Sequence, residues 1–274
     1  MVDDVSRHNQ AQWDELAHAR LEYTLPLLDL TPVEARRRVD PLGILGERLS
    51  DFAGKAVLCL ATGGGQQSAC FALLGARVTV VDLSATQLAR DQEAAAHYDF
   101  SIRTIHSDMR DLSALGDDSF DLVYQAYSIN FVPSVAPVFA EVARVLRPGG
   151  LYHMQWANPF TQSVDDQAWD GETYLLHHPY VDGYEVSTYY PTWDIEDGEG
   201  GWRTIQSPRE FRHILSTVVN TLTEKGFVIL RLQEAMSSEE EPEPGTWEHY
   251  KWVAPPYLTL WATYRPEVFA VNQR

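Results

Sequence analysis

The sequence predicts an α/β protein built around a mainly parallel sheet. Between residues 55 and 156, short apolar runs rich in β-branched residues alternate with stretches of helical pattern. A glycine-rich turn follows the first apolar run, and an acidic residue ends the second. Strands that alternate with helices at this spacing form βαβ units and parallel sheets. The length of 274 residues permits one large domain of this class or two small ones. We expect 1–274 to be a single domain.

The first 50 residues predict a helical cap on this domain. Thr31 and Glu34 have the spacing of a capping box, and Pro32 stands at the first helical position. Three consecutive arginines follow at 36–38. A phosphate grip is one interpretation of these arginines. A solvated helix face is the other, and it is the one we favour.

The central part of the chain contains five predicted strands. They span residues 56–61, 77–82, 101–106, 120–126 and 151–156. Helices are expected between them at 66–75, 84–97 and 134–146. Gly75 ends the first of these helices and Ser84 caps the second, whereas the run Arg147–Gly150 ends the third.

Residues 157–206 interrupt the alternation and are rich in tyrosine and tryptophan. Their alternating apolar positions predict a short hairpin or an inserted lid. Ser207 and Glu210 have the spacing of a second capping box, which predicts a helix that stops at Gly226. Strands are expected at 227–234 and 257–265, joined by an acidic loop without a helix. This connection predicts that the final strand pair is antiparallel.

The turn after the first strand indicates a nucleotide site. Gly63, Gly64 and Gly65 lie between that strand and a helix, so that backbone and ligand can approach closely at free helical N–H groups. Asp82 ends the next strand, where a carboxylate can accept hydrogen bonds from a ribose diol. A dinucleotide fingerprint would require a third glycine at position 68, where Ser68 stands.

The remaining features favour another nucleotide-type ligand. Asp108 follows the third strand, the run Arg147–Gly150 precedes the fifth, and an antiparallel pair ends the sheet. Residues 55–156 resemble a class I S-adenosylmethionine (SAM)-dependent methyltransferase, in the broad group similar to the ubiquinone and menaquinone pathway enzymes. The resemblance implies a Rossmann-like seven-stranded sheet of order 3-2-1-4-5-7-6 with the last strand antiparallel, and SAM as the cofactor.

The resemblance also assigns cofactor-binding positions. It places Gly63, Gly64 and Gly65 beneath the methionine part of SAM, and Gln125 facing that part. It places Asp82 on the ribose. It places Leu83 and Met109 beside the adenine, and Asp108 on the adenine amino group. Two positions depart from the family pattern. Cys59 stands where the family usually has an acid, and Ala61 stands where it usually has a glycine.

No catalytic residue can be assigned from the sequence, because methyl transfer from an activated cofactor depends mainly on positioning. Tyr127, Asn130 and His153 are candidate polar groups at the cofactor-facing strand ends. Trp13 and Tyr23 are expected either to cap the cofactor pocket or to pack in the core. The aromatic residues of 169–202 are expected to form a substrate cage or a small lid core.

Composition excludes several classes of partner. The 39 acidic and 21 basic residues give a net charge of −18, so no nucleic-acid partner is expected.

No apolar run is long enough to span a membrane, and no signal peptide is recognisable. Cys59 and Cys70 form no disulfide pattern, which indicates the cytoplasm. His177 and His178 with Asp165 and Asp166 match no metal motif, so no metal is expected.

The prediction is therefore a cytoplasmic SAM-dependent methyltransferase that acts on a small-molecule acceptor. A non-catalytic SAM-binding module and a nucleotide-dependent oxidoreductase remain as alternatives. The acceptor, the methylated atom and the oligomeric state stay open at this point.

Overall fold

The computed structural model describes residues 3–41, 43, 52–162, 164, 169–176, 178–196 and 201–269. Its core is a seven-stranded sheet of order β3-β2-β1-β4-β5-β9-β8. The strands are β1 (Ala56–Leu60), β2 (Arg77–Asp82), β3 (Arg103–His106), β4 (Phe120–Tyr127), β5 (Leu146–Ala157), β8 (Phe227–Glu234) and β9 (Tyr257–Tyr264). The first five run parallel, and β9 is antiparallel to both β5 and β8. Numbered within this sheet, the order is the predicted 3-2-1-4-5-7-6, and the antiparallel end is confirmed.

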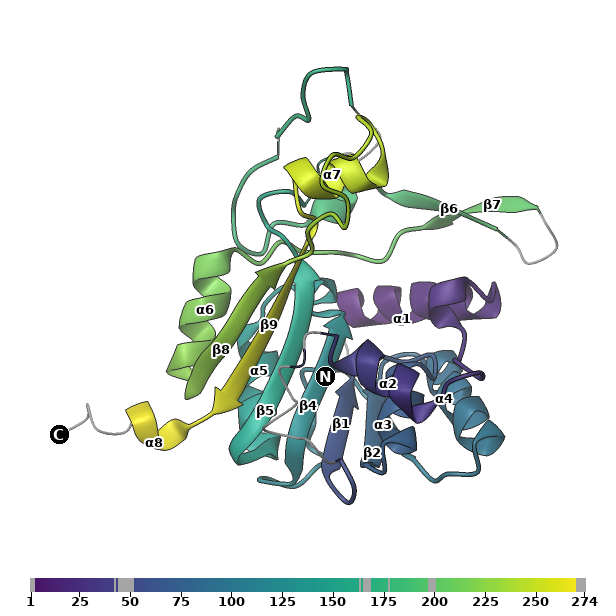
Figure 1. Ribbon diagram of the computed structural model, residues 1–274, viewed down its shortest axis with the longest axis vertical. Helices are drawn as coiled ribbons and strands as arrows, with labels where there is room; N and C mark the ends of the chain where they lie inside the picture. The colour runs from purple at the N-terminus through teal and green to yellow at the C-terminus, as the bar shows by residue number, and fades with distance from the viewer. Residues whose placement is uncertain are drawn as a thin grey trace.

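Helices cover both faces of the sheet (Figure 1). One face packs against α5 (Ala136–Val145) and α6 (Leu215–Glu224). The other packs against α2 (Pro32–Val39), α3 (Gln67–Leu73) and α4 (Ala85–His97). Alternate side chains of a strand point to opposite faces, so a sheet covered on both sides requires continuously apolar strands. All five residues of β1 are buried for this reason.

The helical part of the N-terminal segment begins with α1 (Asp4–His18), which lies across the carboxyl ends of the central strands (Figure 1). The capping box predicted at Thr31 is confirmed, because its hydroxyl accepts from the Glu34 N–H at 3.3 Å and Glu34 accepts from the Thr31 N–H at 2.8 Å. The other short helices are η1 (Glu22–Thr24), η2 (Ile129–Phe131), η3 (Val186–Thr188), α7 (Trp247–Val253) and α8 (Pro266–Phe269). Among the described helices, none has both the length and the apolar character that crossing a membrane requires.

The predicted hairpin in the inserted segment is confirmed. Strands β6 (Thr192–Glu196) and β7 (Trp202–Gln206) pair with each other, separately from the main sheet. The hairpin extends past α1 (Figure 1), and Ile195 and Ile205 pack there against Leu16. The inserted segment is thereby connected to the N-terminal cap.

Two expectations around the last strands were wrong. The capping box at Ser207 opens no helix, and α6 begins at Leu215. The backbone between Ser207 and Leu215 forms hydrogen bonds with distant segments instead. The Phe211 N–H donates to the Asn130 carbonyl at 2.7 Å. The Arg212 N–H donates to the Tyr184 carbonyl at 2.8 Å. The connection between β8 and β9 contains α7, although no helix was expected there.

Candidate active site

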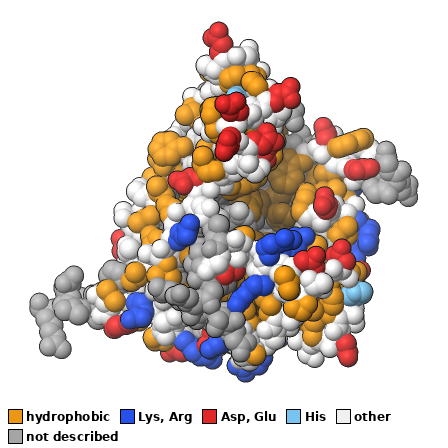
Figure 2. All heavy atoms as spheres, viewed as in Figure 1, with side chains coloured by type: hydrophobic (Ala, Val, Ile, Leu, Met, Phe, Trp, Pro, Cys, Tyr) orange, Lys and Arg blue, Asp and Glu red, His pale blue; other side chains and the backbone are white. Residues whose placement is uncertain are grey.

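A cavity of about 520 Å³ lies at the carboxyl edge of the sheet. Its walls come from the turn after β1, the ends of β2 and β4, the loop after β3, and α1. Figure 2 shows a recess with hydrophobic side chains in this region, between the β6–β7 hairpin and α1. The volume is in the range of small-molecule and cofactor sites, and the position is where ligands bind to open α/β sheets.

The glycine turn packs closely against Asp82 and α4 at Gly63. A Cβ atom on Gly63 would lie 2.5 Å from the Gln87 Cβ and 2.9 Å from the Asp82 Oδ2, so only glycine fits this position. The Gly63 N–H donates to that Asp82 oxygen at 2.9 Å. Ala61, at the start of the turn, has a φ of +49°, in the left-handed region that favours glycine. The departure at Ala61 therefore stands at a strained position in the wall.

Asp82 lies in the cavity wall with both carboxylate oxygens already engaged. Its Oδ1 accepts from the Ser84 N–H at 2.8 Å, and its Oδ2 accepts from Gly63. Burial raises the pKa of Asp82, and the two backbone hydrogen bonds oppose this rise. A carboxylate has about four acceptor sites, so capacity remains for hydroxyl groups in the cavity.

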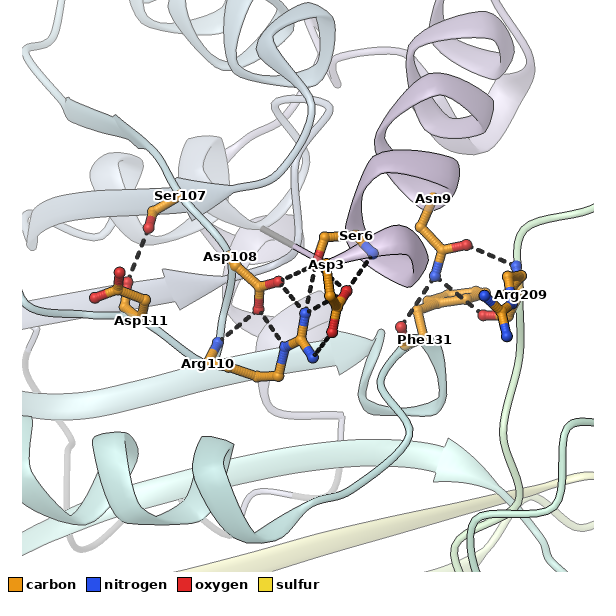
Figure 3. A network of polar contacts seen from close by, with 9 residues as sticks. All are labelled: Asp3, Ser6, Asn9, Ser107, Asp108, Arg110, Asp111, Phe131 and Arg209. Atoms are coloured by element: carbon orange, nitrogen blue, oxygen red, sulfur yellow. Dashed lines mark hydrogen bonds and ion pairs between the residues drawn. The ribbon is translucent and has the colours of Figure 1, made fainter. Parts of the chain in front are cut away.

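Asp108 lies in the same wall, within a network that sequence reasoning missed (Figure 3). Its carboxylate accepts from the Ser6 hydroxyl at 2.6 Å and from the Arg110 guanidinium at 2.6 Å. Arg110 also pairs with Asp3 at 2.8 Å. Burial alone would raise the pKa of Asp108, but the hydrogen bonds from Arg110 and Ser6 outweigh it and lower that pKa. The network joins the first turn of α1 to the loop after β3.

A second buried acid supports the turn from α4. Asp91 is fully buried, and its Oδ1 accepts from the Gly65 N–H at 3.1 Å and from the Ser68 hydroxyl at 2.5 Å. Burial raises the pKa of Asp91 to about 7. Ser68, at the position where a dinucleotide fingerprint would need glycine, thus connects the turn to α4. The sequence offered no signal for Asp91, because its contact depends on how α4 packs.

The structure brings together some of the predicted cofactor residues and not others. The cavity wall contains Gly63, Asp82, Leu83, Asp108 and Met109. The wall does not include Gly64, Gly65 or Gln125.

Gln125 lies behind the wall, two positions before the end of β4. Its side chain is fully buried, accepts from the Tyr152 hydroxyl at 2.6 Å and donates to the Ser128 hydroxyl at 3.1 Å. Strand alternation places it on the same face as Val123, in the core beneath α5 and α6. The pairing of β4 with β5 shifts register between Gln125 and Tyr127, and Ala126 and Tyr127 line the cavity.

Of the three candidate polar groups, only Tyr127 lines this cavity. Asn130 is fully buried, donates to the Phe211 carbonyl at 3.1 Å and accepts from the Ala157 N–H at 3.0 Å, which is a structural role. His153 stacks on Tyr124 with ring centroids 4.0 Å apart, and burial lowers the pKa of His153 to about 3.

Aromatic side chains form much of the remaining wall. Trp13 and Tyr23 line the cavity, together with Phe131, Trp193 and Tyr257. Trp13 packs edge-on against Phe131, with ring centroids 5.1 Å apart. Of the two placements considered for Trp13 and Tyr23, the structure therefore shows the one in the pocket wall.

Most aromatic residues of the inserted segment lie elsewhere. Trp169 packs on His249 at 4.6 Å between ring centroids, and Tyr174 packs on Tyr250 at 5.3 Å, so they form a small core with α7. Asp165, Asp166 and His177 lie outside the described residues. Within the part that is described, no group of three or more His, Cys, Asp or Glu side chains is arranged to hold a metal ion.

Comparison with known sequences identifies relatives of the chain. Residues 58–154 match the family described as a methyltransferase domain. The uncharacterized methyltransferase YbaJ of Bacillus subtilis (strain 168) is 30% identical over 235 residues, which cover 83% of this chain and 89% of that protein. A ubiquinone biosynthesis O-methyltransferase of Xanthomonas oryzae pv. oryzae (strain PXO99A) is 33% identical over 137 residues, which cover 48% of this chain and 52% of that enzyme.

Solved structures agree on the fold. A putative SAM-dependent methyltransferase from Listeria monocytogenes superposes with a TM-score of 0.56 at 21% identity, covering 80% of this chain and 97% of that one. The sheet order, its antiparallel end and the relatives do not favour the oxidoreductase alternative. The chain belongs to the class I SAM-dependent methyltransferases.

Proposed function

We propose that the protein binds SAM in this cavity and transfers its methyl group to a small-molecule acceptor held beside it. One observation carries the proposal. A single cavity joins the glycine cradle at Gly63 and two carboxylates, Asp82 and Asp108, to a wall of aromatic side chains. The polar half suits a cofactor with a ribose and an adenine, and the apolar half suits a hydrophobic acceptor.

In this proposal, each residue of the polar half contacts a different part of the cofactor. Asp82 accepts from the ribose hydroxyls, Leu83 and Met109 contact the adenine, and Asp108 accepts from the adenine amino group. Gly63 gives the methionine part room against the turn. When bound, SAM supplies a methyl group that is already activated on sulfur, so the protein has to align the acceptor and exclude water.

Gly64, Gly65 and Gln125 act from behind this wall in our account. A Cβ on Gly65 would lie 2.6 Å from the Arg90 carbonyl oxygen, so this glycine lets the turn pack on α4. Gln125 fixes the end of β4 through Tyr152. Their contribution to cofactor binding is therefore indirect.

The acceptor half favours a flat, hydrophobic small molecule. Trp13, Phe131, Trp193 and Tyr257 present aromatic surface to the cavity. The name of the Xanthomonas relative, a ubiquinone biosynthesis O-methyltransferase, supports the same substrate class. We propose that the β6–β7 hairpin, which carries Trp193, closes over this half as a lid.

A labelling experiment tests the proposal without a known acceptor. The protein is incubated with SAM carrying a labelled methyl group and a cell extract, and the label is counted in small-molecule, protein and RNA fractions. We expect label in the small-molecule fraction, and at least tenfold less label with an Asp82→Ala variant when SAM is subsaturating. Label confined to protein or RNA would contradict the substrate class, and no transfer by a protein that binds SAM would favour the non-catalytic module.

We also infer a cytoplasmic location. Cys59 and Cys70 are both buried free thiols. Free thiols are typical of reducing compartments. Fractionation of the source cells would test this inference.

A further inference from the structure

The acceptor half of the cavity contains a tyrosine that is hydrogen-bonded to a partly buried glutamate. Tyr127 lines the cavity at the end of β4, and its hydroxyl donates to the Glu210 Oε1. The Gln162 amide donates to the same oxygen at 3.0 Å. Glu210 belongs to the segment before α6 where a helix was expected, and the extended backbone of that segment brings it beside the strand end.

No cation neutralises Glu210 among the ion pairs of the described residues. The neighbouring Arg209 pairs with Glu185 instead, at 2.7 Å. Burial raises the pKa of Glu210, while the hydrogen bonds from Tyr127 and Gln162 partly oppose the rise. A carboxylate that is partly removed from water and has no counter-ion binds a proton more readily than an exposed one.

Tyr127 stands between this carboxylate and the cavity. Its ring is held edge-on by Tyr257, at 5.3 Å between centroids, and by Phe131, at 6.0 Å. Burial raises the pKa of Tyr127, and the charge of Glu210 raises it further. The hydroxyl is therefore protonated at neutral pH, so it can accept a proton only while it passes its own to Glu210.

We propose that Tyr127 and Glu210 together form the proton acceptor for an aromatic hydroxyl group of the methyl acceptor. The inference rests on the proposed function and adds the substrate class to it. An amine attacks without losing a proton first, whereas a hydroxyl becomes a strong nucleophile only as its proton leaves. A phenolic acceptor also suits the aromatic walls of the cavity and the Tyr127 hydroxyl that would take its proton.

The step balances in atoms and charge. The proton of the acceptor hydroxyl moves to the Tyr127 oxygen, and the proton of Tyr127 moves to Glu210. The acceptor oxygen forms a bond to the methyl carbon with its own electron pair, while the carbon–sulfur bond breaks and leaves its pair on sulfur. The negative charge of Glu210 and the positive charge of the sulfonium disappear together, which suits a site shielded from water.

Chromogenic phenols test this proton transfer without turnover. The protein is saturated with S-adenosylhomocysteine, and 4-nitrophenol, 4-nitrocatechol and 7-hydroxycoumarin are titrated in turn. Their spectra distinguish phenol from phenolate. The pH of each titration is set about one unit below the pKa of the free probe, where most of that probe is the neutral phenol. We expect at least one probe to bind and to show a phenolate fraction at least threefold higher than the free probe at the same pH.

Three variants accompany the wild type. Glu210→Gln keeps the hydrogen-bonding shape but cannot take the proton, and Tyr127→Phe breaks the relay at its other member. Both should bind the probe with an affinity within about threefold of wild type but as the neutral phenol. Glu185→Gln, which removes the carboxylate paired with Arg209, should behave as wild type.

The outcomes separate the inference from the function on which it rests. An unchanged phenolate fraction in either Glu210→Gln or Tyr127→Phe would overturn the relay. Binding of S-adenosylhomocysteine without binding of any probe would overturn the aromatic hydroxyl class and leave the cofactor assignment standing. Failure of wild-type protein to bind S-adenosylhomocysteine would overturn the proposed function itself.

Discussion

At the scale of single residues, Ala61 shows how a departure from the family pattern is accommodated. The resemblance placed a glycine here, and the backbone keeps the left-handed conformation that glycine favours, with a φ of +49°. An alanine in this conformation costs about 1–2 kcal/mol. Part of that cost is offset because alanine restricts the unfolded chain more than glycine does, by about 0.4–1 kcal/mol.

Ala61→Gly should therefore stabilise the protein, by up to about 1 kcal/mol. Ala89→Gly is the matched control, since Ala89 is exposed inside α4 and its replacement should cost about 1 kcal/mol. Denaturant unfolding of the two variants measures both effects. Equal destabilisation by both substitutions would show that the turn is not strained at Ala61.

Asp91 predicts a pH dependence of stability. Its pKa is raised to about 7 in the folded protein, above the ordinary value of 3.8 in the unfolded chain. The contribution of Asp91 to stability is then fully present below about pH 4 and is lost as the pH rises through about 7. Each unit of pKa shift is worth about 1.4 kcal/mol, so the loss amounts to a few kcal/mol.

Asp91→Asn should remove this dependence. The stability of the variant relative to wild type should increase between pH 5 and pH 8, as followed by urea unfolding at both values. Asp111→Asn is a control, because Asp111 is exposed in the loop after β3. A constant difference between Asp91→Asn and wild type across this range would contradict a raised pKa at Asp91.

At the scale of elements, we propose that the β6–β7 hairpin contacts the acceptor and not the cofactor. Trp193 on β6 lines the cavity, while Trp202 on β7 is 74% exposed. Trp193→Ala should weaken binding of the phenol probes at least tenfold. Affinity for SAM should change by less than tenfold, about 1.4 kcal/mol. Calorimetry measures the cofactor and the spectral titration measures the probes.

Trp202→Ala is the matched control for the hairpin, because it removes the same side chain from the neighbouring strand without touching the cavity. It should leave both affinities unchanged. If Trp193→Ala weakened the affinity for SAM as strongly as the affinity for the probes, the hairpin would belong to the cofactor half.

The sequence predicted the elements of the core well and the contacts between distant elements poorly. Strand alternation and capping residues such as Thr31 and Ser84 are local signals, and they placed most strands and helices close to their observed bounds. Ser207 was misread because its segment exchanges backbone hydrogen bonds with residues far away in the chain. Glu210 was interpreted as a capping residue and Arg110 was not singled out, since their positions beside the site exist only after tertiary packing.

At the scale of the whole molecule, the net charge of −18 predicts a protein that does not bind nucleic acid. The arginines at 36–38 are three consecutive basic residues, and Arg36 lies over the Phe52 ring at 5.0 Å. Filter binding with duplex DNA and generic RNA at physiological salt should show no submicromolar complex. A tight complex that weakens steeply with salt would point to a basic surface on this acidic protein.

We propose that the cavity binds SAM through Asp82. Calorimetric titration of SAM into wild-type protein, Asp82→Ala and the control Asp111→Ala tests it most directly. Each hydrogen bond to the carboxylate is worth about 1.5–3 kcal/mol, so Asp82→Ala should lose at least tenfold in affinity while Asp111→Ala keeps the wild-type value. Unchanged SAM affinity in a folded Asp82→Ala protein would contradict the account.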